Sequence, residues 1–338
     1  MRVAAVGRVA GPSAGALVDG IGRRLRYLRL SVTEACNFRC AYCLPDGRPP
    51  GPMPSPLSVV EIRRLVTAFA ALGVEKVRLT GGEPTLREDV GEIVRAVAEI
   101  PGLRVALTTN GYRLARVAGE LREAGLAAVN VSVDSLAPAR FEAITGRPLL
   151  SSVVAGVEAA LAAGIPSVKV NAVLLRGFDD VELERFLAWT RRAPLTVRFI
   201  ELMRTAGNGA FFRARHLDAA WIARALEARG WEALPDGVAD GPAVTWGHSD
   251  HAGRVGIIAP YAEGFCDTCN RVRVSAAGNL RLCLFGDAEI PLRRHLHSDL
   301  AREALTRAIS GAVVAKPPSH RLRDGDPGAT ASFAMIGG

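Results

Sequence analysis

Hydrophobic positions follow two alternating periods along the first 200 residues. Stretches that suit strands lie at 26–32, 76–80, 104–109, 128–133, 167–173 and 196–202. Between them, apolar residues recur every three or four positions, as in helices. These helical stretches cover 58–70, 88–100, 113–124, 151–163 and 180–190. Six strands separated by helices predict parallel βαβ units in an α/β fold, two units short of a closed eight-unit barrel.

Polar and glycine residues gather where these predicted strands end. In parallel α/β folds the carboxyl ends of the strands meet at one rim, and ligands bind there. The residues that the pattern brings to this rim are the first cysteines, Gly81 to Glu83, Thr108 to Asn110, Ser132, Asp134, Lys169, Asn171 and Glu201. We therefore predict one active-site rim that is supplied by all six strands.

The pattern changes after residue 204. A glycine-containing linker at 204–210 and a helix at 214–229 precede short strands at 243–246, 254–259, 271–275 and 280–284, and a helix at 298–311 follows. We predict a smaller α+β domain over 205–338 that ends in a loose Gly337-Gly338 tail. The barrel then covers 23–204. Residues 1–22, whose apolar run is broken by glycines, are predicted to be a flexible leader rather than a signal peptide.

Composition narrows the class of protein. Of the 338 residues 49% are hydrophobic and 22% are charged, which is typical of a globular protein with a sizeable core. The formal net charge of +8 favours an anionic partner. No apolar run reaches the length of a membrane span. The six cysteines fall into two trios, which suits metal sites in a reducing cytoplasm better than secreted disulfides.

The first trio is Cys36, Cys40 and Cys43, directly after the first predicted strand. Three thiolates can hold three irons of a four-iron cluster and leave the fourth iron open to a ligand. Half of a zinc site and a buried thiol cluster are the alternatives. Zinc usually takes four ligands, and no nearby Cys or His supplies the fourth.

Gly81-Gly82-Glu83-Pro84 follows the second predicted strand. Glycines allow a ligand to approach the backbone closely, so N–H and C=O groups here could pair with the ammonium and carboxylate of an amino acid. The alternative interpretation is a tight turn between strand and helix.

The second trio is Cys266, Cys269 and Cys283. Arg271 and Arg273, two residues apart on a predicted strand, project from one face and suit phosphate oxygens. A zinc knuckle completed by one of three histidines is the alternative here, namely His295, His297 or His320.

The two trios together carry a resemblance. Cys36-x3-Cys40-x2-Cys43 followed by Gly81-Gly82-Glu83-Pro84 resembles the radical S-adenosylmethionine superfamily. From about residue 24 to the end, the chain is similar to the GTP 3′,8-cyclase family of molybdenum-cofactor biosynthesis. The matching stretches are 27–31, 77–84, 130–135, 198–203 and 266–273, together with the terminal Gly-Gly.

The resemblance implies a fold and a set of site residues. The fold is a partial (βα)6 TIM-like barrel followed by the smaller domain, with two [4Fe-4S] clusters, one on each trio. The open iron of the second cluster binds guanine. The implied S-adenosylmethionine positions are Tyr42, Gly82, Ser132 and Met203. The implied GTP positions are Arg29, Arg78, Thr108, Lys169, Arg198, Arg271, Val272 and Arg273. The family's tail reaches the active site, which makes Gly337 and Gly338 candidate catalytic residues.

The implied reaction begins with reductive cleavage of S-adenosylmethionine. The deoxyadenosyl radical removes the ribose 3′ hydrogen of GTP, and the carbon radical attacks C8 to give 3′,8-cyclo-7,8-dihydro-GTP. The implied partners are GTP, S-adenosylmethionine, an electron donor for the cluster and, by product handover, cyclic pyranopterin monophosphate synthase; a homodimer is left open. Another radical enzyme acting on an anionic substrate, or a zinc-stabilised nucleic-acid-binding protein, remains as an alternative.

Overall fold

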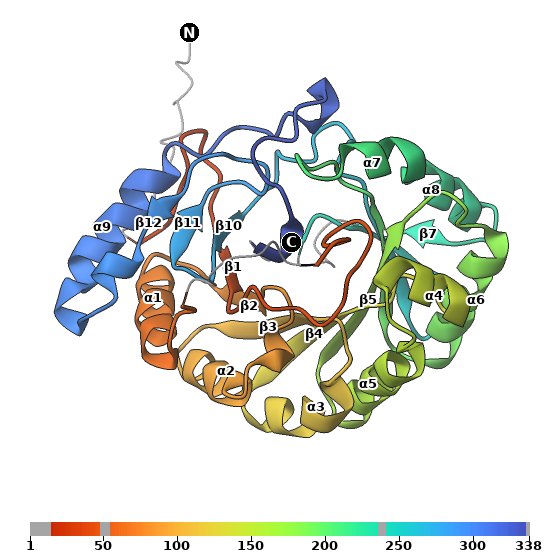
Figure 1. Ribbon diagram of the computed structural model, residues 1–338, viewed down its shortest axis with the longest axis horizontal. Coiled ribbons are helices and arrows are strands. Elements are labelled where there is room, and N and C mark those ends of the chain that lie inside the picture. Colours follow the sequence, from red (N-terminus) through yellow and green to blue (C-terminus); the bar gives the residue numbers. More distant parts are fainter. Residues whose placement is uncertain (1–14, 48–54, 236–240, 336–338) are drawn as a thin grey trace, which may run out of the picture.

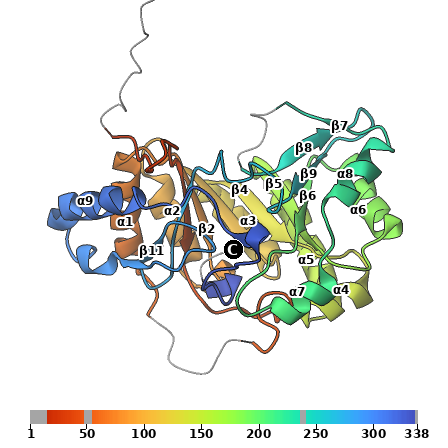
Figure 2. The same ribbon diagram turned by 90° about the horizontal axis from the view of Figure 1, so that it is seen from above.

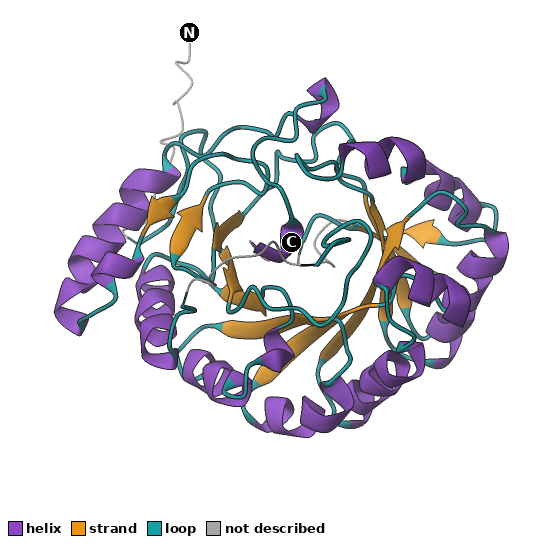
Figure 3. Cartoon of the chain, viewed as in Figure 1, coloured by secondary structure: helices purple, strands orange, loops and turns teal. Residues whose placement is uncertain are grey.

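The computed structural model describes residues 15–47, 55–235 and 241–335. Strands and helices alternate through its first part, with the strands inside and the helices outside (Figures 1 and 3). The elements are β1 Tyr27–Ser31, α1 Val59–Ala71, β2 Lys76–Thr80, α2 Val90–Ala98, β3 Arg104–Thr109, α3 Leu114–Glu123, β4 Leu126–Ser132, α4 Pro138–Thr145, α5 Leu150–Ala162, β5 Ser167–Leu174, α6 Asp180–Arg192 and β6 Thr196–Glu201. All six predicted strands and the five predicted helices are confirmed, and α4 was not predicted.

The six strands pair in parallel and in sequence order, β1 to β6. One face of the sheet packs against the helices through a continuous apolar core. The other face carries the polar side chains. This division follows from the two-residue period of a strand, which sends alternate side chains to opposite faces.

The part after residue 204 extends both edges of this same sheet. β9 pairs in parallel with β6, and β10 pairs in parallel with β1, which gives the order β12-β11-β10-β1-β2-β3-β4-β5-β6-β9-β8-β7. The additional strands are β7 Glu232–Ala233, β8 Val244–Gly247, β9 Arg254–Ile258, β10 Arg271–Val274, β11 Asn279–Arg281 and β12 Ile290–Pro291. The predicted smaller domain therefore shares its sheet with the partial barrel.

Helices of this later part differ in detail from the prediction. Two helices, α7 Gly209–Arg215 and α8 Ala220–Glu227, replace the single helix predicted at 214–229, and α7 begins within the predicted linker. α9 Arg302–Val313 confirms the last helix and packs against α1 (Figure 2). Short 3₁₀ helices are η1 Pro84–Leu86, η2 Arg293–His295, η3 Asp299–Ala301, η4 Leu322–Asp324 and η5 Phe333–Met335.

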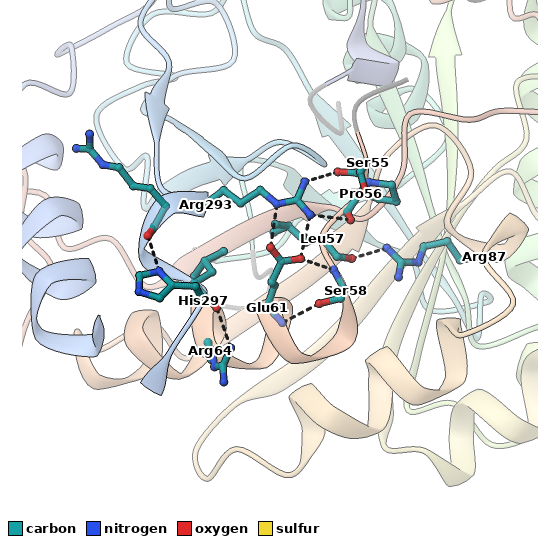
Figure 4. Close-up of polar contacts among 11 residues, drawn as sticks. Ser55, Pro56, Leu57, Ser58, Glu61, Arg64, Arg87, Arg293 and His297 are labelled. Atoms are coloured by element: carbon teal, nitrogen blue, oxygen red, sulfur yellow. Dashed lines mark hydrogen bonds and ion pairs between the residues drawn. The ribbon is translucent and has the colours of Figure 1, made fainter. Parts of the chain in front are cut away.

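The start of α1 shows how the two parts are joined. Ser58 accepts a hydrogen bond from Glu61 N, and the Glu61 carboxylate accepts one from Ser58 N, which forms a capping box. The same carboxylate pairs with Arg293 of η2, whose guanidinium also donates to the carbonyl of Ser55 (Figure 4). A side chain from the later part thus fixes the entry into the first barrel helix.

The predicted flexible leader is wrong for residues 15–22. Leu17 and Asp19 are buried, and backbone hydrogen bonds tie Leu17 to Leu72 and to Leu25. The Asp19 carboxylate closes a turn by accepting hydrogen bonds from the backbone and side chain of Arg23. Residues 1–14 lie outside the described residues. None of the helices in the described ranges has the length and apolar character that a membrane span requires.

Candidate active site

The first cysteine trio lies on a loop after β1 rather than on a helix. The loop is anchored from outside itself: Arg39 N donates to Thr145 O at 3.0 Å, and Ala41 N donates to Ile144 O at 2.8 Å. Both carbonyls belong to the end of α4, which terminates at the left-handed Gly146. The sequence did not predict α4, yet this helix holds the predicted cysteine loop in place.

The glycine turn at 81–84 packs directly against this loop. Gly82 N donates to Thr33 O at 2.8 Å, and Glu83 N donates to Ala35 O at 2.7 Å. A Cβ atom on Gly81 or Gly82 would overlap those same backbone carbonyls. The prediction that N–H groups of this turn bind a ligand is therefore wrong for Gly82 and Glu83, whereas the prediction for the C=O groups stays untested. The two glycines allow the turn to contact the cysteine loop closely.

Glu83 links the glycine turn to the end of β3 and, through Asn110, to the cysteine loop. It is fully buried, and its carboxylate accepts hydrogen bonds from Thr85, from the hydroxyl of Thr109 at 2.7 Å and from Asn110 N at 2.6 Å. Asn110 in turn donates to the Asn37 side chain at 2.8 Å, within the cysteine loop. Strands β2 and β3 thereby set the position of the first trio.

The second trio comes from two separate loops. Cys266 and Cys269 lie in a turn before β10, where Cys269 N donates to Cys266 O at 3.1 Å. Cys283 follows β11, which pairs with β10 in antiparallel fashion. All six cysteines are free thiols with intermediate exposure.

Both trios line one cavity at the carboxyl rim of the strands. In the parts of the chain that the structure describes, no three Cys, His, Asp or Glu side chains converge as one metal ion would require. A zinc ion holds its thiolates at about 2.3 Å. A four-iron cluster is larger and spreads its three ligands further apart. Three thiols in each trio are the kind of donor set that an iron–sulfur cluster takes.

Three buried polar atoms at this cavity have no partner among the described residues. They are Asn130 Oδ1, Arg273 Nε and His320 Nε2. Leaving a buried polar group unsatisfied costs about 1–3 kcal/mol. Such groups around one cavity indicate that a bound ligand supplies their partners.

Sheet register places the cations in a row. Arg29 on β1 stands beside Arg273 on β10 and Arg78 on β2, and the adjacent row places Tyr27 beside Arg271. Because neighbouring strands in register point equivalent side chains to the same face, this wall is set by the backbone.

Two further contacts shape this wall of arginines. Arg78 donates to the Tyr27 hydroxyl at 2.5 Å and to Leu107 O at 2.8 Å. On the opposite side Arg198 donates twice to Asn171 Oδ1, at 2.9 and 2.8 Å. Gly256 pairs with Arg198 from the neighbouring strand β9, and a Cβ atom on Gly256 would lie 3.0 Å from Arg198 Cγ. The small residue gives that guanidinium room.

Most of the predicted site residues meet at the cavity. Those that line it are the six cysteines, Tyr42, Gly82, Ser132, Met203, Arg29, Thr108, Arg198, Arg271 and Arg273. Arg78 and Lys169 do not line it, although Arg78 approaches the Thr108 hydroxyl at 3.4 Å. The Val272 side chain points away into the apolar core, so its predicted contact with GTP is not supported for the side chain. Gly337 and Gly338 lie outside the described residues.

The surroundings of the first trio favour positive charge. Burial raises the pKa of Cys36 to about 11, and it also raises the pKa of Asp134 to about 6. Asp134 is held by Val173 N at 2.9 Å and by the Tyr42 hydroxyl at 2.9 Å. Burial, followed by the charge of Asp134, raises the pKa of Cys40. The negative charge of Asp134, unlike burial, would also attract a cation to this side of the cavity.

Nearby cations outweigh burial at one thiol of the second trio, Cys269, whereas burial raises the pKa of Cys266. Burial alone would raise the pKa of Cys269, but the charges of Arg271 and Lys316 outweigh it and lower the pKa to about 7. Lys316 is buried and donates to Leu282 O, next to Cys283. Burial, then the nearby cations Arg29 and Arg271, lower the pKa of Arg273. Anionic ligands are the expected occupants of this half of the cavity.

Several cavity residues escaped the sequence analysis. Asn130 and Lys316 line the cavity, as do Phe333 and Ala334 near the carboxyl end. The Ser332 hydroxyl donates to Cys43 O at 2.9 Å, so this last segment reaches the first trio. Figure 1 shows the described end of the chain at the centre of the barrel. Alternation along β4 could have indicated Asn130, whereas no local pattern indicates Lys316.

Comparison with known proteins agrees with this architecture. A Radical SAM superfamily model matches residues 30–190, and a Molybdenum Cofactor Synthesis C model matches residues 195–322. Streptococcus suis SuiB bound to S-adenosylmethionine shares the fold, with a TM-score of 0.63 at 14% identity over 86% of this chain and 68% of that one. The partial barrel and its cysteine loop thus define a radical S-adenosylmethionine protein.

Curated relatives define a narrower group. A GTP 3′,8-cyclase of Aeromonas hydrophila is 52% identical, with 95% of this chain and 96% of the relative covered. One from Stenotrophomonas maltophilia is 51% identical, covering 95% and 99%. The chain belongs to the GTP 3′,8-cyclase family.

Proposed function

We propose that this protein is the lyase that converts GTP into (8S)-3′,8-cyclo-7,8-dihydroguanosine 5′-triphosphate, the first step of molybdenum-cofactor biosynthesis. It uses S-adenosylmethionine and two [4Fe-4S] clusters. The observation that carries the proposal is the single cavity that both cysteine trios and the arginine wall line. Neither an isolated cluster site nor an isolated phosphate site explains that combination.

The six thiols divide between the two clusters. Cys36, Cys40 and Cys43 hold the first, and Cys266, Cys269 and Cys283 hold the second. When bound, the first cluster supplies the electron that cleaves S-adenosylmethionine, and the second offers an open iron to guanine. The remaining work belongs to the protein, which binds, orients and shields the two substrates.

The part of the cavity beside Asp134 and the first trio, called the acidic half below, binds S-adenosylmethionine, which carries a sulfonium group. Asp134 fixes the Tyr42 ring through its hydroxyl, so the ring is positioned before the cofactor arrives. Ser132, Gly82 and Met203 complete this side of the cavity. A buried carboxylate near a sulfonium group stabilises its positive charge, because the low-dielectric surroundings strengthen the attraction.

The part of the cavity beside the arginines and the second trio, called the basic half below, binds the triphosphate of GTP. Arg29, Arg271 and Arg273 converge from adjacent strands, and their fixed guanidinium forks match phosphate oxygens. Arg78 and Thr108 support this wall through their mutual contact. Lys169 belongs to the proposal by family resemblance, since its side chain lies outside the cavity lining.

Shielding the reaction matters because a carbon radical takes hydrogen from any accessible donor. The helices of the barrel enclose one side of the sheet, and Phe333 and Ala334 line the cavity together with the two trios. The terminal Gly337 and Gly338 are included in the proposed active site on family grounds. An external electron donor, transfer of the product to cyclic pyranopterin monophosphate synthase, a cytoplasmic location and a homodimer complete the proposal.

The direct test is an anaerobic assay on reconstituted protein with GTP, S-adenosylmethionine and a chemical reductant. We expect formation of 5′-deoxyadenosine and of a cyclised product with the mass of GTP. Deuterium at the ribose 3′ position should appear in the 5′-deoxyadenosine. Cleavage of S-adenosylmethionine with no change in GTP would contradict the proposal and favour a different anionic substrate.

A further inference from the structure

The turn at Asp19–Arg23 lies far from the second trio in the sequence but beside it in space. Arg23 Nη1 donates to Cys266 O at 2.8 Å and to Pro318 O at 2.6 Å, and Nη2 donates to Pro317 O at 2.7 Å. One guanidinium thus joins the cysteine turn to the segment 316–318. We propose that Arg23 is a positioning residue for the second iron–sulfur centre, which rests on the proposed function above.

The segment that Arg23 holds touches both loops of the trio. Lys316 donates to Leu282 O, one residue before Cys283. Further along, the backbone of His320 lies beside the Cys266 thiol. Residues 316–320 therefore contact both cysteine loops, in addition to the β10–β11 pairing that links the strands beside those loops.

Pro317 and Pro318 accept hydrogen bonds from a residue outside the segment 316–320. Proline has no backbone N–H, so the carbonyl is its only backbone group for hydrogen bonding. Arg23 is the donor to both carbonyls. Without it, two neighbouring carbonyls lose their partners, and the segment has fewer ways to keep its position.

Arg23 is itself rigidly held. Its Nε donates to Asp19 Oδ2 at 2.6 Å, and its backbone N donates to Oδ1 at 2.9 Å. The side chains of Arg23 and Asp19 are 9% and 0% exposed. A buried guanidinium with four of its five N–H groups hydrogen-bonded can set the spacing of the loops that it joins. Outer partners of this kind typically change metal affinity 10–100-fold when removed.

The test follows cluster retention after anaerobic reconstitution. Arg23→Ala should lose iron and sulfide from the second centre about tenfold faster than wild type in the presence of a chelator. The spectrum of the reduced second cluster should change as well. Arg23→Lys, which keeps the charge but cannot reach all three carbonyls, should fall between the two. Cleavage of S-adenosylmethionine without GTP turnover should remain within about twofold of wild type, because the first trio does not contact Arg23.

Arg229→Ala is the matched control. Arg229 also binds three acceptors, Asp180, Glu184 and Ala225 O, on the far side of the barrel, so it reports general loss of stability. Equal loss of both clusters in Arg23→Ala, or a second cluster that is as stable and spectroscopically unchanged as in wild type, would overturn the proposal. Absence of a second cluster from wild type would instead contradict the proposed function.

Discussion

The two cysteine trios line one cavity but are built in opposite ways. The first comes from a single loop, which backbone groups of α4 and of the glycine turn hold in place. The second comes from two loops, which the side chains of Arg23 and Lys316 join. Their electrostatics differ too, because a buried carboxylate lies near the first and a row of cations near the second.

This contrast explains how one cavity can receive two ligands of opposite charge. Under the proposed function, S-adenosylmethionine would bind beside Asp134 and the triphosphate beside Arg271 and Arg273. Exchanging the two ligands would place like charges together in surroundings of low dielectric, which is costly. In the proposed function, charge would therefore keep the two substrates apart in the cavity.

Two single variants, each lacking one thiol of one trio, should have the largest effect and should distinguish the two trios. Cys40→Ala should lower both cleavage of S-adenosylmethionine and GTP cyclisation by more than about 1000-fold, because the first cluster carries the initiating chemistry. Cys269→Ala should abolish cyclisation but retain cleavage. Quantifying 5′-deoxyadenosine and cyclised product separately checks both outcomes. Complete loss of cleavage in Cys269→Ala would show that the trios do not act independently.

The cation wall gives the next largest effect. Arg271→Ala with Arg273→Ala should weaken GTP binding by roughly 100-fold or more, since each charge-assisted hydrogen bond contributes about 1.5–3 kcal/mol. Reductive cleavage of S-adenosylmethionine should survive. Anaerobic equilibrium binding measures the first quantity, and Arg254→Ala, at an exposed position on β9, is the control. Normal GTP affinity in the double variant would exclude these arginines as phosphate ligands.

On the acidic side, Asp134→Asn should weaken S-adenosylmethionine binding by about tenfold. The substitution removes the negative charge and disturbs the hydrogen bond that orients Tyr42. Tyr42→Phe, which removes only that hydrogen bond, should have a smaller effect. GTP affinity, measured in parallel, should stay constant in both. A larger change for GTP than for the cofactor would reverse the assignment of the two halves.

Tyr27 offers the most specific effect, because it appears only as a dependence on pH. Burial would raise its pKa, but Arg78, Arg29 and Lys76 outweigh it and lower the pKa to about 7. Above that pH the free enzyme holds a phenolate among its arginines. A bound triphosphate competes with this phenolate and favours its protonation, so affinity should fall as pH rises through 7 and be unaffected well below it.

The matched variant for that effect is Tyr27→Phe. Between pH 6 and 8.5 the ratio of wild-type to variant dissociation constants for GTP should rise by about tenfold. Ionisation of GTP itself cancels in this ratio, because it is common to both proteins. A ratio that is flat across this range would show that Tyr27 does not titrate against the triphosphate.

Much of the barrel could be predicted because its information is local. Ile62, Leu65, Val66 and Phe69 follow the helical period, and all four are buried in α1 as expected. The short helix α4 was missed because its eight residues carry little amphipathic pattern between two longer segments. Even so, its last turn holds the cysteine loop.

The site was harder to predict where it depends on distant pairing. Parallel pairing of β10 with β1 brings Arg271 and Arg273 into the barrel, and no local pattern specifies that neighbour. The roles of Lys316 and Arg23 likewise depend on carbonyls more than 30 residues away in the chain. Gly82 was assigned to the cavity correctly, but the purpose of its missing side chain became clear only from the Ala35 carbonyl beside it.

The central claim is that each trio holds its own incompletely ligated cluster. Iron and sulfide analysis after anaerobic reconstitution tests it most directly, using wild type and two variants in which one trio at a time is replaced by alanine. The account predicts about eight irons per chain in wild type and about four in each variant. About four irons in wild type, or the loss of all iron when either trio is removed, would contradict it.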